Sequence, residues 1–200
     1  MPIFIEGNIG VGKSTLLRLL SENGFETMQE PVDAWTSIRN EDGKNILENF
    51  YEDPKRWAYT FQSIAFRSRM RGLDCISPTA IAERSIYTDR YVFAEVARNA
   101  GNITNVEWHD YTDWFDFVVS KTTQKSIDFV YLRADPEVCH DRIQTRCRPG
   151  EEGISLEYLT QLHDRHDEWL LNESGVLVLN MNRQRPEDVV QPILSFLKSK

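Results

Sequence analysis

A glycine-rich run near the start of the sequence has the residue types and the spacing of a phosphate-binding loop. The pattern G-x-x-x-x-G-K-[ST] is matched by Gly7, Asn8, Ile9, Gly10, Val11, Gly12, Lys13 and Ser14, with Thr15 next. Glycines let backbone N–H groups converge on phosphate oxygens, and a following helix directs its positive dipole end to the same place. Lys13 would bridge the β- and γ-phosphates of a nucleoside triphosphate, and Ser14 would coordinate Mg²⁺. The alternative, a strand–helix turn that binds nothing, fits the full pattern and its context poorly.

Charged residues directly follow two other apolar runs. Glu30 ends the run that begins at Phe25, and Glu83 and Arg84 end the run that begins at Thr79. In an open parallel sheet, ligands gather beyond the carboxyl ends of the strands, so these side chains would face the phosphate-binding loop. A carboxylate at position 30 suits a general base that accepts the proton of an attacking hydroxyl. Taken alone, Glu30 fits an exposed surface carboxylate better, and Glu83 and Arg84 could form a salt bridge at the sheet edge.

Three arginines lie close together in the second half of the chain. Arg142 and Arg146 are four residues apart in a predicted helix, so they share one face, and Arg148 follows near its end. Such a cluster repels itself unless an anion or nearby acids neutralise it. A mobile lid that clamps ATP phosphates and spreads the charge of the transition state would use arginines in this way. By itself, a solvated basic face is the simpler interpretation.

Short apolar runs alternate with longer segments of helical period, which is typical of an α/β domain around a parallel sheet. Five strands are predicted, at residues 3–6, 25–30, 79–83, 127–132 and 176–179. Helices are predicted to begin near Lys13, Pro54, Thr88, Val106, Pro136, Ser155 and Pro186. Residues 36–44 are polar and are predicted to form a loop. Because the sequence has no repeat, low-complexity tract or linker, residues 1–200 are predicted to form one domain.

Composition and charge argue against several classes of partner. A formal net charge of −8 does not suit DNA or RNA as the main partner, since their binding needs a continuous basic surface. The sequence has no long apolar span and no basic leader, so no membrane partner and a cytoplasmic location are expected. Cys75, Cys139 and Cys147 have no CxxC spacing, which favours a reducing compartment over a disulfide framework.

Further motifs follow the phosphate-binding loop in an order that resembles a known family. They are Glu30-Pro31-Val32 with Trp35, Trp57 through Phe61-Gln62, Glu83-Arg84-Ser85 with Asp89-Arg90-Tyr91, the three arginines, and Leu156-Glu157-Tyr158-Leu159. Over nearly the whole chain, they resemble the deoxynucleoside kinases of the deoxycytidine, deoxyguanosine and insect multisubstrate type. The resemblance implies a P-loop kinase of class α/β, with a five-stranded parallel sheet flanked by helices and an Arg-rich lid at about residues 142–153.

The same resemblance implies an activity and the partners that go with it. The family transfers the γ-phosphate of ATP to the 5′-hydroxyl of a deoxynucleoside, with Mg²⁺ as cofactor, and so makes deoxynucleoside monophosphates for nucleotide salvage. ATP is the expected donor, and UTP stays open as an alternative; the polar residues 182–185 are expected to border the donor base. A homodimer is implied, joined through helices near residues 92–97 and 111–119.

Catalytic roles for the charged residues also come from the resemblance. Glu30 is expected to be the general base, and Arg84 to steady the 5′-oxygen and the transferring phosphoryl group. Glu83 is expected to help Ser14 to hold Mg²⁺. The lid arginines that contact the ATP phosphates are expected to be Arg142, Arg146 and Arg148.

One acid of the lid is expected to bind the sugar. Glu151 matches the family residue that hydrogen-bonds the 3′-hydroxyl, with Tyr51 as its partner. Pro149 and Gly150 stand where the family more often has polar or acidic residues. This departure leaves open both the stiffness of the lid and the register of Glu151 against Glu152.

The deoxynucleoside base is expected to lie between aromatic walls and to be read at its edge. By resemblance, the walls are Trp35, Phe61 and Phe93, and the amide that pairs with the base edge is Gln62. Arg69 and Asp89 occupy the positions at which thymidine-accepting relatives have small or apolar residues. Deoxycytidine, deoxyadenosine and deoxyguanosine are therefore the predicted substrates, and thymidine is disfavoured. Each aromatic residue alone would more often belong to a core.

Parts of the same pattern are also compatible with other functions and other site residues. A thymidine-accepting, broad-specificity deoxynucleoside kinase stays open, as does a thymidylate-type nucleoside monophosphate kinase, which shares the Asp-Arg-Tyr run. A carboxylate at position 30 suits a neutral hydroxyl better than a phosphate acceptor. A pseudoenzyme should have lost Lys13, Glu30 or Arg84, and a bare nucleotide switch does not need an aromatic pocket. His163 and His166 have a spacing that could bind a metal, but solvated or interface residues are expected instead.

Overall fold

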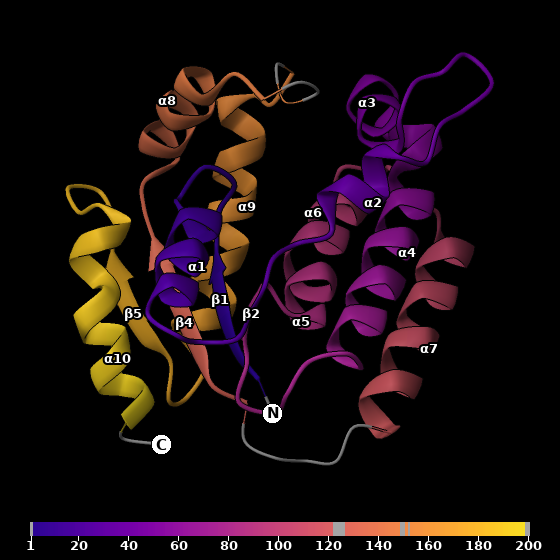
Figure 1. The fold of residues 1–200 in the computed structure, drawn as a ribbon. Coiled ribbons are helices and arrows are strands. Elements are labelled where there is room, and N and C mark those ends of the chain that lie inside the picture. Colours follow the sequence, from indigo (N-terminus) through magenta and orange to yellow (C-terminus); the bar gives the residue numbers. More distant parts are fainter. Residues whose placement is uncertain (1, 122–126, 149–150, 152, 199–200) are drawn as a thin grey trace. The chain divides into compact units, whose positions relative to one another are not determined.

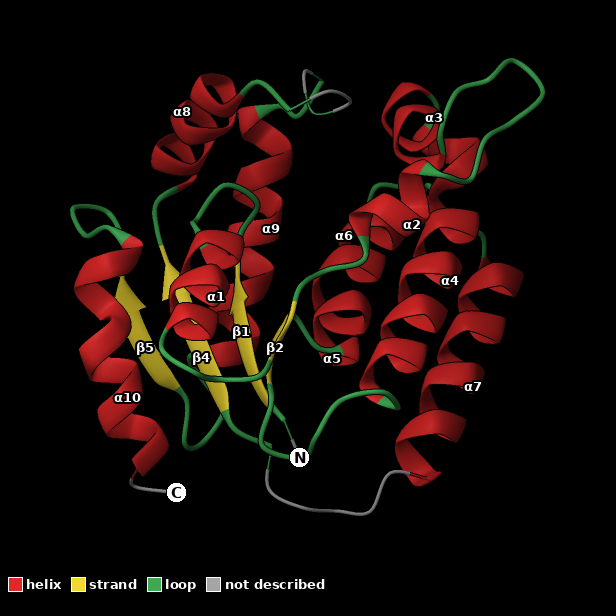
Figure 2. Cartoon of the chain, in the orientation of Figure 1, coloured by secondary structure: helices red, strands yellow, loops and turns green. Residues whose placement is uncertain are grey.

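The computed structural model describes residues 2–121, 127–148, 151 and 153–198 (Figure 1). These residues form two compact units. The first unit comprises the described part of residues 1–30, 75–85 and 126–200, and the second that of residues 31–74 and 86–125. The first unit contains the five-stranded sheet, whereas the second consists of helices and the segments that connect them (Figure 2).

The sheet of the first unit is parallel and has five strands, as predicted. The strand order is β2-β3-β1-β4-β5. The strands are β1 (Ile3–Gly7), β2 (Thr27–Met28), β3 (Ile81–Glu83), β4 (Phe129–Arg133) and β5 (Leu177–Asn180). The prediction of a strand over residues 25–30 was too long, because β2 lies at the sheet edge and its neighbour β3 has only three residues. Glu30 therefore lies in the connection after β2.

Buried apolar residues explain the central strands. Phe4, Ile5, Val130 and Leu132 are almost fully buried, as expected for parallel strands that are covered on both faces. On one face, α1 (Lys13–Glu22) contacts α10 (Val190–Lys198), which follows the 3₁₀ turn η2 (Pro186–Val189). On the other face lies α9 (Leu156–Leu170), which contacts α8 (Pro136–Arg146) beyond the upper ends of the strands (Figure 1). With both faces covered, polar side chains gather at the carboxyl ends of the strands.

Helices build the second unit. They are α2 (Val32–Thr36), α3 (Ile46–Glu52), α4 (Pro54–Leu73), α5 (Ile86–Thr88), η1 (Asp89–Phe93), α6 (Ala94–Asn99) and α7 (Asn105–Lys121). The predicted start at Pro54 is confirmed, and the side chain of Asp53 caps that helix by accepting the N–H of Arg56. The short helices α2 and α3 were not predicted. A capping box begins α3, in which Asn45 and Glu48 accept each other's backbone N–H.

The segment η1 is a π-helical turn between α5 and α6. The sequence predicts a regular helix here, starting near Thr88. Asp89 begins the π-helical turn and Phe93 ends it. Such turns are rare and are often found at functional sites, which fits the expectation that both residues belong to the base site.

Two histidines of α9 are buried within the chain, which corrects the expectation that they are solvated or interface residues. His166 is fully buried, its Nδ1 lies 2.7 Å from Leu162 O, and its ring stacks on that of Tyr131. His163 is buried as well, and its Nδ1 lies 3.1 Å from Ala134 O. Both histidines lie on the helix face that packs into the core of the unit, and burial lowers the pKa of His166 to about 3.

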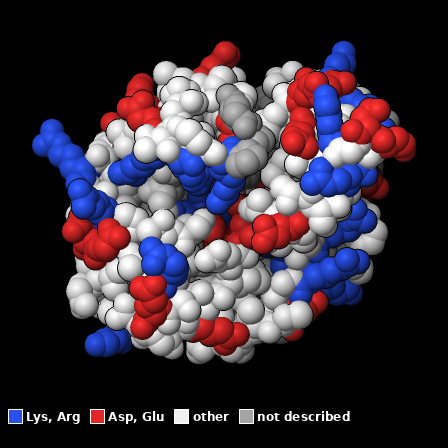
Figure 3. All heavy atoms as spheres, turned by 45° about the horizontal axis from the view of Figure 1, so that its top comes forward, with Lys and Arg blue, Asp and Glu red and all other residues white. Residues whose placement is uncertain are grey.

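Acidic and basic side chains are intermixed on the face shown in Figure 3. This distribution accompanies the net charge of −8. Among the residues that the structure describes, no helix combines the length and the hydropathy needed to span a bilayer.

Candidate active site

The phosphate-binding loop connects β1 to α1 and is held in a narrow space. Gly7 has a φ of 139° and Gly10 a φ of 82°, and both values strain any residue with a Cβ. A Cβ at Gly7 would collide with Leu132 O, and one at Gly10 would lie 2.5 Å from Cys139 O. The loop is also tied to α9, since Asn8 Nδ2 donates a hydrogen bond of 2.8 Å to Leu159 O. The predicted glycines are thus required by the packing as well as by the motif.

Lys13 is the first residue of α1, and its side chain folds back over the loop. The ammonium donates to Gly7 O at 3.1 Å and to Asn8 O at 2.8 Å. The side chain is buried, and burial, followed by the nearby charge of Arg84, lowers the pKa of Lys13 to about 8. The two carbonyl oxygens hold the ammonium at the mouth of the loop, where phosphate oxygens could replace them.

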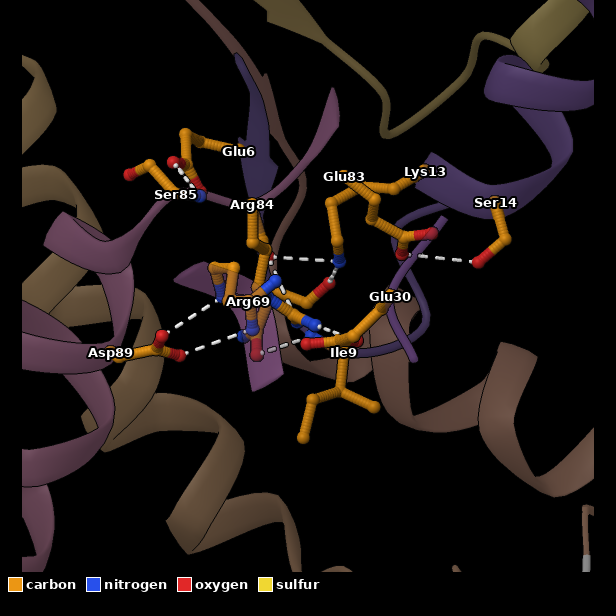
Figure 4. A network of polar contacts seen from close by, with 12 residues as sticks. Glu6, Ile9, Lys13, Ser14, Glu30, Arg69, Glu83, Arg84, Ser85 and Asp89 are labelled. Carbon is orange, nitrogen blue, oxygen red and sulfur yellow. Dashed lines mark hydrogen bonds and ion pairs between the residues drawn. The ribbon is translucent and has the colours of Figure 1, made fainter. Parts of the chain in front are cut away.

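Ser14 and Glu83, the two residues expected to hold the metal ion, contact each other. Ser14 Oγ donates a hydrogen bond of 3.1 Å to Glu83 Oε1 (Figure 4). One residue comes from the first turn of α1 and the other from the last position of β3. A hydroxyl and a carboxylate are hard oxygen ligands of the type that Mg²⁺ prefers. The chemistry of this donor pair therefore fits the expected cation.

Glu30 and Arg84 form an ion pair beside the phosphate-binding loop. Arg84 Nη1 donates to Glu30 Oε2 at 2.6 Å, and Arg84 Nη2 donates to Gly7 O at 3.3 Å (Figure 4). The same carbonyl of Gly7 accepts from Lys13. The charge of Glu30 also acts on Lys13, whose pKa it raises against the larger effect of burial. The predicted arginine and the loop lysine thus share one backbone carbonyl, and the predicted base pairs with that arginine.

The three arginines after β4 do not form one cluster. Arg142 donates to Val11 O at 3.2 Å and to Met181 O at 2.8 Å, so it lies against the phosphate-binding loop. Arg146 forms an ion pair with Glu151, and Arg148 Nη1 lies 3.4 Å from Glu151 Oε1. Glu151 therefore neutralises the charges of both Arg146 and Arg148.

The end of α8 explains the separation of Arg148 from Arg142. Cys147 has a φ of 49°, in the left-handed region, and ends the helix directly after Arg146. The chain then turns, so Arg148 leaves the face that carries Arg142. The predicted positions Pro149, Gly150 and Glu152 lie outside the described residues, and so does the question of register that they raise.

The expected residues of the base site belong to the second unit, and two of them form a closed ion pair. Arg69 Nε donates to Asp89 Oδ2 at 2.8 Å, and Nη2 donates to Oδ1 at 3.1 Å. Only 1% of the Arg69 side chain and 2% of the Asp89 side chain are exposed. Such a bidentate pair fixes the orientation of both side chains. Tyr111 lies nearby, and burial, followed by the charge of Asp89, raises the pKa of its hydroxyl.

The aromatic residues expected in the base site lie in the second unit, and several of them pack against one another. Trp35 contacts Phe61 edge to face, with ring centroids 5.5 Å apart, and its indole N–H donates to Ser68 Oγ at 2.8 Å. Tyr51 packs against Phe50, which also contacts Phe61. The amide residue Gln62, one position along α4, is buried. The remaining predicted wall residue, Phe93, ends η1.

One buried acid near the loop was not predicted as a site residue. Glu6 lies in β1 directly before Gly7, and its Oε1 accepts a hydrogen bond of 2.9 Å from Ser85 N. A signal was present in the sequence, since Glu6 is the one charged residue in the otherwise apolar run before the loop. Acids are rarely buried without a partner, so this position predicts a specific contact.

Comparisons with known proteins identify a family for this chain. The model of the deoxynucleoside kinase family matches residues 3–198. Deoxycytidine kinase 2 of Gallus gallus is 39% identical over 98% of this chain and 90% of the relative. A probable deoxycytidine kinase of Fowlpox virus is 38% identical over 90% of this chain and 77% of the relative. The mitochondrial deoxyguanosine kinase of Xenopus laevis is 37% identical over 85% of this chain and 73% of the relative. The chain therefore belongs to the deoxynucleoside kinase family.

Proposed function

We propose that this protein transfers the γ-phosphate of ATP to the 5′-hydroxyl of a deoxynucleoside, in nucleotide salvage. The observation that carries the proposal is that Lys13 and Arg84 share the carbonyl of Gly7, while Arg84 pairs with Glu30. A phosphate-binding cation, a second cation and a carboxylate within reach of one another are what in-line transfer to a hydroxyl requires. The family membership and the names of the relatives support the same activity.

Each charged residue has a distinct role in this proposal. Lys13 exchanges the loop carbonyls for phosphate oxygens when ATP binds. Glu30 accepts a hydrogen bond from the 5′-hydroxyl and takes its proton as the oxygen attacks. Arg84, already paired with Glu30, donates to the 5′-oxygen and to the transferring phosphoryl group, where negative charge is distributed.

Ser14 and Glu83 would hold the Mg²⁺ that the reaction needs. When bound, Mg²⁺ neutralises charge on the phosphates. The hydrogen bond between the two side chains keeps their oxygens together on α1 and β3. Replacement of Glu83 by glutamine should raise the Mg²⁺ concentration needed for half-maximal activity, and this titration checks the assignment.

The segment at about residues 142–153 is proposed as a lid of a single kinase domain that spans residues 1–200. Arg142 already contacts the phosphate-binding loop through Val11 O, which supports a role at the ATP phosphates. Arg146 and Arg148 would reach the phosphates by releasing Glu151, which would then be available for the sugar 3′-hydroxyl with Tyr51 as its partner. The ion pairs of Glu151 with both arginines supply the alternative partners that such an exchange needs.

The base preference is proposed from the closed pair of Arg69 and Asp89. A charged, bidentate pair offers polar atoms to a base edge and leaves little space for a methyl group. Gln62 would pair with the base edge, and Trp35, Phe61 and Phe93 would form the walls. Deoxycytidine, deoxyadenosine and deoxyguanosine should therefore be preferred over thymidine, in line with the names of the relatives.

A substrate panel tests both the reaction and the preference. The purified chain is incubated with Mg²⁺, with ATP or UTP, and with each of the four deoxynucleosides, and the products are identified by mass spectrometry. The expected result is a 5′-monophosphate from three of them, with kcat/KM for thymidine at least about tenfold lower, as a pocket that cannot accept a methyl group would give. A Lys13→Met variant controls for contaminating kinases.

Three outcomes of this panel would contradict the proposal at different levels. A dominant thymidine activity would overturn the base preference alone. Phosphorylation of thymidine monophosphate, without activity on any deoxynucleoside, would place the protein with thymidylate-type kinases. An inactive wild-type protein that still folds would remove the catalytic function altogether.

A homodimer and a cytoplasmic location are part of the proposal. Val106, Trp114 and Phe117 of α7 are large apolar side chains with more than half of their surface exposed, which supports a contact through this helix. Cys75, Cys139 and Cys147 are free thiols, in line with a reducing compartment. Light scattering tests the dimer. Microscopy of a tagged chain tests the location against that of the mitochondrial relative.

A further inference from the structure

Glu6 is a fully buried carboxylate in the strand that leads into the phosphate-binding loop. Its neighbours in β1 are apolar, and its Oε1 accepts a hydrogen bond of 2.9 Å from the backbone N–H of Ser85. Removal of a carboxylate from water costs free energy that only well-placed hydrogen bonds offset. The burial of Glu6 is therefore explained by the hydrogen bonds that its carboxylate accepts.

The residue before Ser85 is Arg84, whose backbone is strained. Arg84 has a φ of 59°, in the left-handed region, which costs a residue with a side chain about 1–2 kcal/mol. Such a conformation persists only where its surroundings enforce it. Two contacts from β1 do so, since the N–H of Arg84 donates to Ile5 O at 3.0 Å and the next N–H donates to Glu6. The turn is thus fixed on both sides of Arg84.

The direction of the Arg84 side chain follows from this turn. Its guanidinium donates to Glu30 Oε2 and to Gly7 O, whereas the contact between Glu6 and Ser85 lies at the other end of the residue (Figure 4). Gly7 directly follows Glu6, so one short stretch of β1 supports both the start of the loop and the backbone of Arg84. A change at position 6 can therefore move the guanidinium without replacing any group that meets substrate.

We propose that Glu6 is a positioning residue for phosphoryl transfer, because its carboxylate holds the left-handed turn that directs Arg84 toward Glu30 and the phosphate-binding loop. The inference rests on the proposed function of Arg84 at the 5′-oxygen. A displacement of about 1 Å at a reacting centre can lower the rate about 100-fold, so the effect should fall on kcat. Binding of ATP, which depends on the loop itself, should change little.

Two substitutions at position 6 separate the hydrogen bond from the charge. Glu6→Gln keeps an oxygen that can accept from Ser85, and kcat should stay within about threefold of wild type. Glu6→Leu has a similar volume but no acceptor, and kcat should fall about 10-fold to 100-fold, while KM for the deoxynucleoside and Kd for ATP change less than about threefold. Equal kcat values for wild type and Glu6→Leu would overturn the inference.

A double-mutant cycle with Arg84 distinguishes positioning from a general structural role. If Glu6 acts through Arg84, then Glu6→Leu should lower kcat by less than about twofold in an Arg84→Ala background. An undiminished loss in that background would show that Glu6 acts on the fold as a whole, and would overturn the inference. Circular dichroism melting of all four proteins controls for unfolding.

A crystal structure gives a readout that does not depend on activity. Glu6→Asp keeps the charge and shortens the side chain by one methylene, so it serves if Glu6→Leu does not fold. In either variant, Arg84 should leave its left-handed φ and lose the contact with Glu30, and unchanged geometry would overturn the inference. An inactive wild-type protein would refute the proposed function, whereas the position of Arg84 in the variant would still decide the role of Glu6.

Discussion

An ion pair between an arginine and an acid lies in each unit, and the two pairs are held differently. In the second unit, Arg69 and Asp89 are joined by two parallel hydrogen bonds, with 1% and 2% of their side chains exposed. In the first unit, Arg84 and Glu30 are joined at 2.6 Å, and 14% of the Glu30 side chain is exposed. Arg84 also shares a loop carbonyl with Lys13. The closed pair is suited to a fixed recognition element, and the more open pair to an exchange of partners with substrate.

The largest expected effect comes from Glu30→Gln, which removes the proposed base from the open pair. The amide can still accept a hydrogen bond from Arg84, so the geometry is retained while the proton acceptor is lost. We expect kcat to fall about 10²-fold to 10⁴-fold, with a smaller loss in the free energy of unfolding than for the closed pair, because the amide oxygen and Gly7 O still accept from Arg84. Steady-state kinetics and urea unfolding measure the two quantities. A kcat within tenfold of wild type would mean that Glu30 is not the base.

The closed pair should respond in stability to the matching substitution, Asp89→Asn. This change leaves a buried guanidinium without its carboxylate, and the free energy of unfolding should fall by about 3–5 kcal/mol. The double variant Arg69→Met, Asp89→Leu should recover most of that loss, since it removes both buried charges. Urea unfolding of the three proteins beside Glu30→Gln tests the contrast directly. The contrast between the two ion pairs is refuted if Asp89→Asn is no less stable than Glu30→Gln.

Acid should destabilise the first unit through a group that is buried without charge. Burial lowers the pKa of His166 from 6.5 to about 3, so between these values the unfolded state binds a proton that the folded state does not. Stability is therefore greatest above pH 6.5 and decreases as the pH falls toward 3. We expect a loss of about 2–3 kcal/mol between pH 7 and pH 4.5 from this residue. His166→Phe, which keeps a ring beside Tyr131, should flatten the pH dependence by that amount, and an unchanged slope would exclude His166 as its source.

The smallest expected effect is a difference between the two units in the number of protons taken up when a ligand binds. The pKa of Lys13 is lowered to about 8 in the free protein, and phosphate oxygens should raise it again. At pH 8, binding of ATP should therefore take up as much as about half a proton, measured by calorimetry in buffers of different ionisation enthalpy. Lys13→Met should abolish this component. The guanidinium of Arg69 stays protonated, so deoxynucleoside binding should show no such component from the closed pair.

The predictable parts of the site were those specified by local sequence. The phosphate-binding loop, the parallel sheet and the meeting of Ser14 with Glu83 follow from a short motif and from strand ends that must share one edge. The same argument predicted that Glu30 and Arg84 face the loop, but not that they pair with each other, since the salt bridge considered was that of Glu83 with Arg84. The roles of these residues in binding and catalysis stay predictions, to be decided by the variants above.

Features that depend on packing were predicted less well. The burial of His166 could have been recognised, because it shares a helix face with Leu159, Leu162 and Leu170, all of which are buried. The capping box of Asn45 and Glu48 was also a readable signal for α3. In contrast, the length of β2 was set by its neighbour in the sheet. The pairing of Glu151 with two arginines depends on where α8 ends, which propensity alone does not fix.

The contact between Gly10 and α8 restricts how the proposed lid could open. A Cβ at Gly10 would lie 2.5 Å from Cys139 O and 2.9 Å from Ile143 Cγ1, so the loop and the first half of α8 already touch. Because the two segments are close-packed, the first half of α8 has no space to move toward the phosphate-binding loop when ATP binds. A hinge must then lie beyond Ile143. The left-handed Cys147 could serve as the hinge for Arg148, whereas Arg146 precedes it in α8 and would reach the phosphates by rotation of its own side chain.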